Sequence, residues 1–190
     1  MTGASTLAGR VRLRIHAVPG APVVALRAWL PGGCRTESIP GQGRVTGRLL
    51  SEGTRRRDFQ RIAADAEAVG ADVSSSGGFE RVWVAVDALA DDWQRACDWL
   101  AELVLESSFP PERARWVVRQ VGAELESLGD RPEIRTAWAF MEQLYAPHPY
   151  ARPVQGTPEG LASLTAEDCA AFHAASLAAG PIVTAAGSLP

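Results

Sequence analysis

Two arginines one helical turn apart and one distant glutamate are the residues of this sequence whose types and positions best suit chemistry. Arg44 and Arg48 are four residues apart, so a helix through them places both guanidinium groups on one face. Glu124 falls on the edge of an apolar stripe with helical spacing, and a carboxylate facing a core must be ion-paired, hydrogen-bonded or protonated. The residues alone also allow a purely structural interpretation, in which the arginines form a solvated basic face and Glu124 lies exposed at the edge of the core.

The histidines and cysteines do not form a second candidate site. No histidine has another histidine or a cysteine at ligand spacing, so the sequence predicts no metal centre built from them. We interpret His16 as a partly exposed strand residue, His173 as a surface or packing residue, and His148 as a structural residue of a proline-rich loop. The three cysteines are widely spaced and lack a C-x-x-C pair, which favours reduced thiols in a cytosol.

Composition and charge exclude several classes of partner. All 19 basic residues are arginine and the net charge is −3, so no basic surface for nucleic acid or for an anionic membrane is predicted. The first 14 residues lack the continuous apolar core of a signal peptide, and no apolar run approaches the length of a membrane span. We therefore expect a cytoplasmic protein that does not cross a membrane.

Alternating apolar residues predict five strands. Residues 11–16 and 23–30 read as two strands joined by a Pro/Gly turn, which predicts an antiparallel pair. Residues 71–76 and 81–89 read as a second hairpin, because Gly77 and Gly78 stand between two alternating segments. A last strand is predicted over residues 182–186.

Helical periodicity and start signals predict six helices in the intervening segments. These cover about residues 43–51, 57–69, 91–105, 111–128 and 133–145, with a further helix that begins at the Thr165-to-Asp168 segment. Hairpins mixed with runs of helices are typical of an α+β fold. We predict one domain over residues 1–190, with helices packed on one face of a largely antiparallel sheet.

Three stretches of the sequence resemble one family. The first comprises residues 31–37 (P-G-G-C-R-T-E) and 41–54 (G-Q-G-R-V-T-G-R-L-L-S-E-G-T). The second is the amphipathic segment 112–132, and the third is residues 148–157 (H-P-Y-A-R-P-V-Q-G-T). In this order they resemble the N-terminal half of the insulinase and mitochondrial-processing-peptidase family M16, the metallopeptidases with an inverted zinc motif. The resemblance covers nearly the whole chain, and the third stretch is its most specific part.

The resemblance places the family's zinc motif on residues that cannot bind zinc. In the family, the two histidines of H-x-x-E-H bind the metal and the glutamate between them is the general base. Those positions are Arg44, Gly47 and Arg48 here, and the family's third ligand corresponds to Glu124. A guanidinium has no lone pair to offer, and glycine cannot accept a proton. No zinc is expected, and the resemblance implies that one or both arginines pair with Glu124 where the family holds its metal.

Two further acidic residues flank this motif. Glu37 precedes it and Glu52 follows it, and both are candidates for local salt bridges of small energetic weight. Neither is expected to serve as a metal ligand.

The resemblance also implies a partner. Members of the family have two homologous halves that face each other across a chamber, and bacterial and mitochondrial versions often pair a zinc-bearing subunit with one that lacks the motif. The second half is absent from these 190 residues. We expect a fragment of a longer chain, a separate polypeptide for the other half, or pairing with itself or a homologue.

Two functional hypotheses follow from the resemblance. In the first, the chain is a non-catalytic subunit that completes a peptide-binding chamber with a zinc-bearing homologue, and an edge strand of the 71–89 hairpin pairs with an extended peptide. In the second, the chamber performs a non-proteolytic reaction on a small molecule or modified peptide, with Arg44, Arg48 and Glu124 as anion-binding or acid/base groups. An active zinc peptidase would need a different alignment, because the chain contains neither H-x-x-E-H nor H-E-x-x-H.

Overall fold

The strands form one mixed sheet. The structure is a computed structural model that describes residues 2–7 and 11–189. Every neighbouring pair of strands is antiparallel except β2 and β6, which are parallel. From one edge to the other, the six strands are β1 (Thr2–Leu7), β2 (Val11–Ala17), β6 (Ile182–Gly187), β3 (Val23–Pro31), β5 (Arg81–Leu89) and β4 (Asp72–Gly77).

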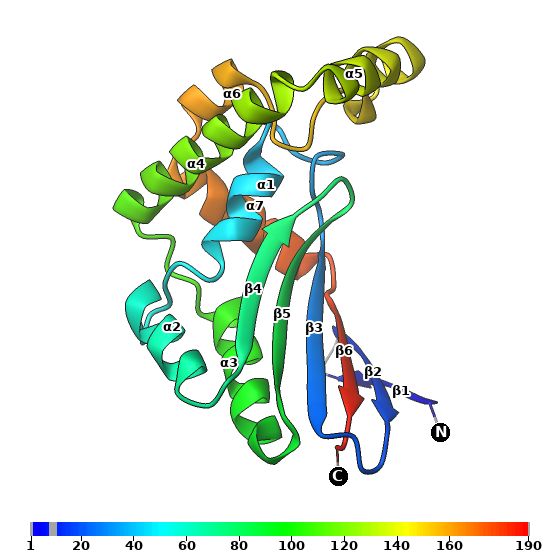
Figure 1. Cartoon of the computed structure of the whole chain (residues 1–190), viewed down its shortest axis with the longest axis vertical. Coiled ribbons are helices and arrows are strands. Elements are labelled where there is room, and N and C mark those ends of the chain that lie inside the picture. The colour runs from blue at the N-terminus through cyan, green and yellow to red at the C-terminus, as the bar shows by residue number, and fades with distance from the viewer. Residues whose placement is uncertain (1, 8–10, 190) are drawn as a thin grey trace.

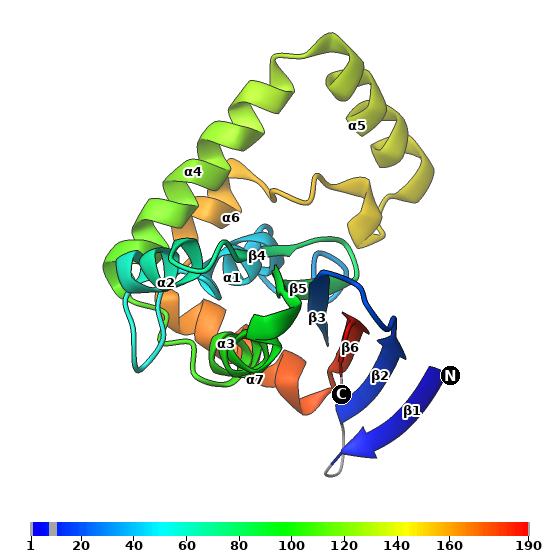
Figure 2. The same ribbon diagram turned by 60° about the horizontal axis from the view of Figure 1, so that its bottom comes forward.

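The helices lie along one face and one end of this sheet (Figures 1 and 2). Helix α3 packs on strands β3 and β5, and α7 packs on β3. Helices α4 and α5 extend away from the sheet (Figure 2). Among the described residues, no helix is both long and apolar enough to cross a membrane. The helices are α1 (Gln42–Leu49), α2 (Phe59–Glu67), α3 (Trp93–Leu105), α4 (Pro111–Gly129), α5 (Pro132–Tyr145), α6 (Pro158–Ser163) and α7 (Ala166–Ala178), with short 3-10 turns at Ala90–Asp92 and Pro149–Ala151.

Alternation of buried residues in the central strands, interrupted in β5 by the buried Ala85, explains why the helices cover only one face. In β3 the even-numbered residues from Val24 to Leu30 are fully buried, and in β5 the same holds for Val82, Val84 and Val86. The opposite face carries polar and half-buried residues, among them the ion pair of Arg27 with Asp87 at 2.7 Å. The predicted α+β class, with helices on one face of a largely antiparallel sheet, is confirmed.

The predicted antiparallel pair of residues 11–16 with residues 23–30 is wrong. Strand β6 lies between them, with Val183 opposite Leu13 on one side and opposite Ala28 on the other. Consecutive strands are usually neighbours, but the turn after Ala17 is wide enough for a distant strand to insert. The pairing partner is the last strand of the chain, so no local pattern near residues 11–30 could reveal it.

Other local predictions match the structure closely. Strands β4 and β5 form the predicted second hairpin. The start of α7 is a capping box, in which the backbone N–H of Asp168 donates to the Thr165 hydroxyl at 3.2 Å and the Asp168 carboxylate accepts from Thr165 N–H at 3.0 Å. Strand β1 and the short helix α6 were not predicted.

Candidate functional site

Helix α1 carries both arginines, and its N-terminus is held by an acidic side chain. The Glu37 carboxylate accepts hydrogen bonds from the backbone N–H groups of Gly41 and Gly43, each at 3.0 Å. Burial raises the pKa of Glu37, and these two hydrogen bonds lower it in part. Glu37 therefore acts as a cap for the helix, and the local salt bridge predicted for it is replaced by backbone contacts.

The backbone of strand β4 lies directly against helix α1. A Cβ atom built on Gly47 would be 2.1 Å from the carbonyl carbon of Ser76, and one built on Gly77 would be 2.0 Å from the Gly43 oxygen. Real side chains do not approach backbone this closely, so no side chain fits at position 47 without displacement of β4. The same contact leaves Arg44 and Arg48, on either side of Gly47, to extend past the strand.

Both arginines reach Glu124 of helix α4. Arg44 Nη2 lies 2.8 Å from Glu124 Oε1, and Arg48 Nη1 lies 3.1 Å from Glu124 Oε2. The side-chain exposures are 21% for Arg44, 36% for Arg48 and 25% for Glu124, so the cluster is partly shielded from water. The structure thus brings together the three side chains that the sequence singled out, while their role in binding stays a prediction.

The remaining contacts hold Arg44 more firmly than Arg48. Arg44 Nη1 donates to the Ser76 hydroxyl at 2.7 Å and to the Gly77 carbonyl at 3.3 Å. The contact of Arg48 with Glu124 is an ion pair only, and within the described residues Glu124 Oε2 accepts no hydrogen bond of good geometry. Arg44 therefore ties β4 to α4, whereas the Arg48 guanidinium keeps donors available.

A glutamine from the proline-rich loop completes the cluster. Gln155 Nε2 donates to Glu124 Oε1 at 2.8 Å. This loop packs tightly on the start of α1, because a Cβ atom on Gly156 would lie 2.4 Å from the Gly41 nitrogen. Sequence reasoning did not single out Gln155, although it stands in the 148–157 segment that carries the most specific resemblance.

The electrostatics keep Glu124 ionised. Burial by itself raises the pKa of this carboxyl, but the hydrogen bond from Gln155 and the charges of Arg44 and Arg48 outweigh it and hold the pKa below its usual value. The cluster therefore holds two permanent positive charges and one negative charge at neutral pH. It contains no histidine or cysteine, and its one carboxylate is already ion-paired, so it has no obvious general base.

The residues of the cluster do not fit zinc. Zinc needs carboxylate, thiolate or neutral imidazole donors, and Glu124 is the only such side chain in the cluster. Within residues 2–7 and 11–189, no group of three or more His, Cys, Asp or Glu side chains could hold a metal ion.

The other residues considered from the sequence lie outside the cluster. His173 is buried beside Phe109, with ring centroids 5.3 Å apart, and burial lowers its pKa. His148 Nδ1 accepts from the backbone N–H of Tyr150 at 3.2 Å, a structural contact within its loop, and His16 is exposed on β2. All three cysteines are free thiols, and burial raises the pKa of Cys34 to about 12.

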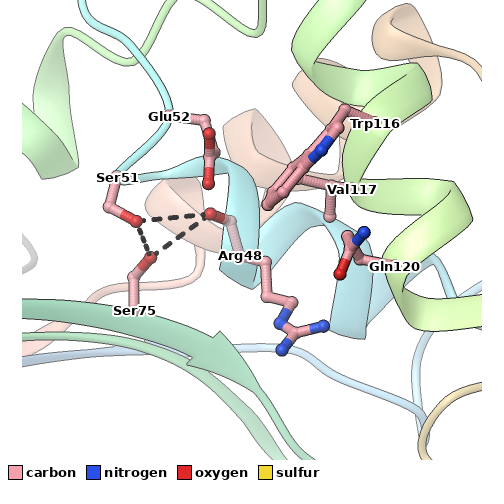
Figure 3. A pocket seen from close by; sticks show the side chains of 7 residues that line it. All are labelled: Arg48, Ser51, Glu52, Ser75, Trp116, Val117 and Gln120. Atoms are coloured by element: carbon pink, nitrogen blue, oxygen red, sulfur yellow. Dashed lines mark hydrogen bonds between the residues drawn. The ribbon is translucent and has the colours of Figure 1, made fainter. Parts of the chain in front are cut away.

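A small pocket opens beside Arg48, between α1, β4 and α4 (Figure 3). Its volume is about 170 Å³, and α4 contributes Trp116 and Gln120 to its lining. Glu52, also in the lining, is paired with Arg113 at an Nε–Oε2 distance of 2.7 Å, so its expected salt bridge is with a helix far along the chain. Sequence reasoning missed this pocket, because no local pattern places α4 against α1.

Comparison with known proteins identifies the family. The family described as Insulinase (Peptidase family M16) matches residues 15–158. The chain belongs to the insulinase family, M16. An uncharacterised zinc protease of Mycobacterium leprae is 26% identical over 171 residues, covering 89% of this chain and 38% of that protein. The uncharacterised zinc protease YmxG of Bacillus subtilis is 24% identical over 159 residues, covering 83% of this chain and 39% of that protein.

Solved structures show the same fold. A peptidase M16 inactive domain from Pseudomonas fluorescens matches all of this chain with a TM-score of 0.92 at 24% identity, over 47% of its own length. A protease from Helicobacter pylori matches with a TM-score of 0.91 at 16% identity, again over 47% of its length. The M16 chain thus spans less than half the length of each of these four proteins.

The contact between α1 and β4 predicts an unusual response to alanine. We expect Gly47→Ala to lower the free energy of unfolding by about 3 kcal/mol, because the new Cβ would overlap the backbone of β4 although alanine favours helix. Gly122→Ala in α4 is the matched control, since nothing lies within 4 Å of its Cβ. The control should gain about 0.5 to 1 kcal/mol. Urea denaturation measures both, and equal effects would contradict the close contact.

Removal of the shared carboxylate should cost stability in a pH-dependent way. We expect Glu124→Gln to destabilise the fold by about 2 kcal/mol at neutral pH, because two arginines lose their counter-ion. The pKa of Glu124 is lower in the folded chain than its unfolded value near 4.5, so the carboxylate's contribution is full above that value and is lost as the pH falls through the folded one.

The control for this change is Glu126→Gln, which alters an exposed glutamate on the same helix. It should change the stability by less than about 0.5 kcal/mol. Denaturation at pH 7 and at successively lower pH values compares the two variants. A Glu124→Gln penalty that stays constant down to acid pH would show that the ion pairs are not its cause.

Proposed function

We propose that this chain is a non-catalytic M16-type module that pairs with a homologous zinc-bearing partner to complete a peptide-binding chamber. The observation that carries the proposal is the Arg44–Glu124–Arg48 cluster at the positions where the family resemblance places a zinc site. An ion-pair network there supplies structure without a Lewis acid or a general base. We interpret it as a degenerate zinc motif.

The close packing at Gly47 supports the same interpretation. The family's general base would occupy this position, yet the β4 backbone leaves no room for any side chain there. Restoring the motif by substitution would therefore also require β4 to move. A chain whose backbone has closed over the catalytic position is better suited to shape a chamber than to hydrolyse peptides.

The printed description of one structural neighbour agrees with this proposal. The Pseudomonas fluorescens protein is described as an M16 inactive domain, and its fold is shared along the whole of this chain. This chain spans 38% to 39% of the mycobacterial and Bacillus relatives, and we propose that a homologous half or subunit faces it across the chamber. We propose that it comes from a zinc-bearing homologue in the cytoplasm.

Strand β4 is the part of this module that we propose to contact peptide. It lies at the edge of the sheet and pairs only with β5 among the described strands. An edge strand offers unpaired backbone groups to an extended chain. Ser75 of β4 lines the pocket together with Arg48, so a peptide on this strand would lie next to the charged cluster.

The alternative of a repurposed, non-proteolytic enzyme has weaker support. Arg44, Arg48 and Glu124 could bind an anionic small molecule or modified peptide, but the cluster has neither a nucleophile nor a base poised near neutral pH. Loss of a measurable activity in a folded Arg48→Ala variant would favour this alternative over the chamber role.

Co-expression tests the proposed function. We expect the chain to co-purify with an M16 protein from the same genome that carries an intact H-x-x-E-H motif, and to raise that protein's peptidase activity. In one control the partner is expressed alone, and in another it is co-expressed with an unrelated protein of similar size. Absence of a complex together with unchanged partner activity would contradict the proposal.

A further inference from the structure

The pocket beside Arg48 has the dimensions of a site for one small chemical group. Its volume of about 170 Å³ is too small for a whole cofactor, and its lining mixes hydroxyl, amide and aromatic side chains. Figure 3 shows Trp116 and Gln120 of α4 facing α1 across the pocket, with Ser51 and Ser75 at the opposite side. Such a lining suits a short polar side chain with an apolar stem.

The acidic residue in the lining is already neutralised. Glu52 pairs with Arg113, whose guanidinium lies 3.8 Å from the centre of the Phe59 ring and 4.3 Å from that of Trp116. Stacking between two aromatic rings fixes this arginine in place. The pair also orients Trp116, which remains 38% exposed at the pocket.

The charged side chains around the pocket have a net charge of about +1. Three arginines (Arg44, Arg48 and Arg113) face two glutamates (Glu52 and Glu124) in these contacts. Arg113 is matched by Glu52, and Arg44 holds Glu124 by a hydrogen bond. The surplus therefore resides on Arg48, the most exposed member of the cluster and the only one that lines the pocket.

Arg48 has the donors to bind a further anion. A guanidinium carries five N–H groups, and the structure assigns Arg48 a single ion-pair contact, at 3.1 Å. Gln120 adds amide donors, and the Ser51 and Ser75 hydroxyls, 3.0 Å apart, add two more polar groups. A surplus charge of one matches a monoanion such as a carboxylate better than a dianion such as doubly ionised phosphate.

We propose that this pocket binds one carboxylate of a peptide ligand, with Arg48 as its ion-pair partner, Gln120 as a further donor and Trp116 against the apolar stem. The carboxylate comes from an acidic side chain or from a peptide C-terminus. The source of the peptide rests on the proposed chamber function, because an extended peptide along β4 passes Ser75 at the pocket. The module thereby selects acidic segments for the chamber.

Matched peptides test this proposal on the chain alone. Acetylated and amidated pentapeptides that differ only by a central Glu or Gln are titrated while the indole N–H signals are followed by NMR. We expect the Glu peptide to bind about tenfold more tightly, since one charge-assisted contact distinguishes the two. A Gln peptide with a free C-terminal acid separates the two sources of carboxylate.

Two variants localise the effect. Arg48→Gln should abolish the preference for the Glu peptide, whereas Arg135→Gln, which removes the same charge from an exposed site on α5, should keep it. Thermal unfolding checks that both variants are folded. A preference that survives Arg48→Gln would overturn the proposal.

Outcomes with the unaltered chain also decide the matter. The carboxylate site would be overturned by equal affinity for the peptides with and without a carboxylate, or by no binding of any peptide. It would also be overturned if inorganic phosphate displaced the Glu peptide at lower concentration than acetate does. Such a result combined with a co-purifying partner would leave the chamber function standing. A carboxylate preference without any partner complex would instead contradict the chamber function alone.

Discussion

The close approach of helix α1 to strand β4 determines most of what this site can do. Glycines at positions 47 and 77 let the two backbones meet without side chains between them. Because position 47 is closed by backbone, the functional groups of the helix can only be those that flank it. Arg44 and Arg48 are therefore the charged groups that the helix presents toward α4, and β4 forms part of the pocket wall.

The arginines would repel each other without the carboxylate on α4. Glu124 forms an ion pair with each arginine and accepts a hydrogen bond from Gln155. This one side chain therefore links α1, α4 and the proline-rich loop. In the M16 family resemblance, a metal would make this link between the same helices. Under the proposed loss of the zinc motif, the ion pairs keep the helices connected without a Lewis acid, and a surplus positive charge lies at Arg48 beside the pocket.

Local signals in the sequence predicted much of the fold, and long-range contacts account for the rest. The β4–β5 hairpin and the capping box at Thr165 rest on neighbouring residues, so they could be predicted. The insertion of β6 between β2 and β3 joins opposite ends of the chain and could not. The contact of both arginines with Glu124 was accessible only because helical spacing and family resemblance coincide, whereas Gln155 and the Trp116 pocket depend on how α4 and the loop fold over α1.

Metal content tests the central claim, that arginine–glutamate ion pairs stand where the family holds zinc. The chain is purified, incubated with excess zinc, desalted and analysed for metal, beside an M16 relative with an intact H-x-x-E-H motif. The ion-pair account predicts far less than one zinc per chain here and about one in the relative. One zinc per chain that disappears in the Glu124→Gln variant would contradict it.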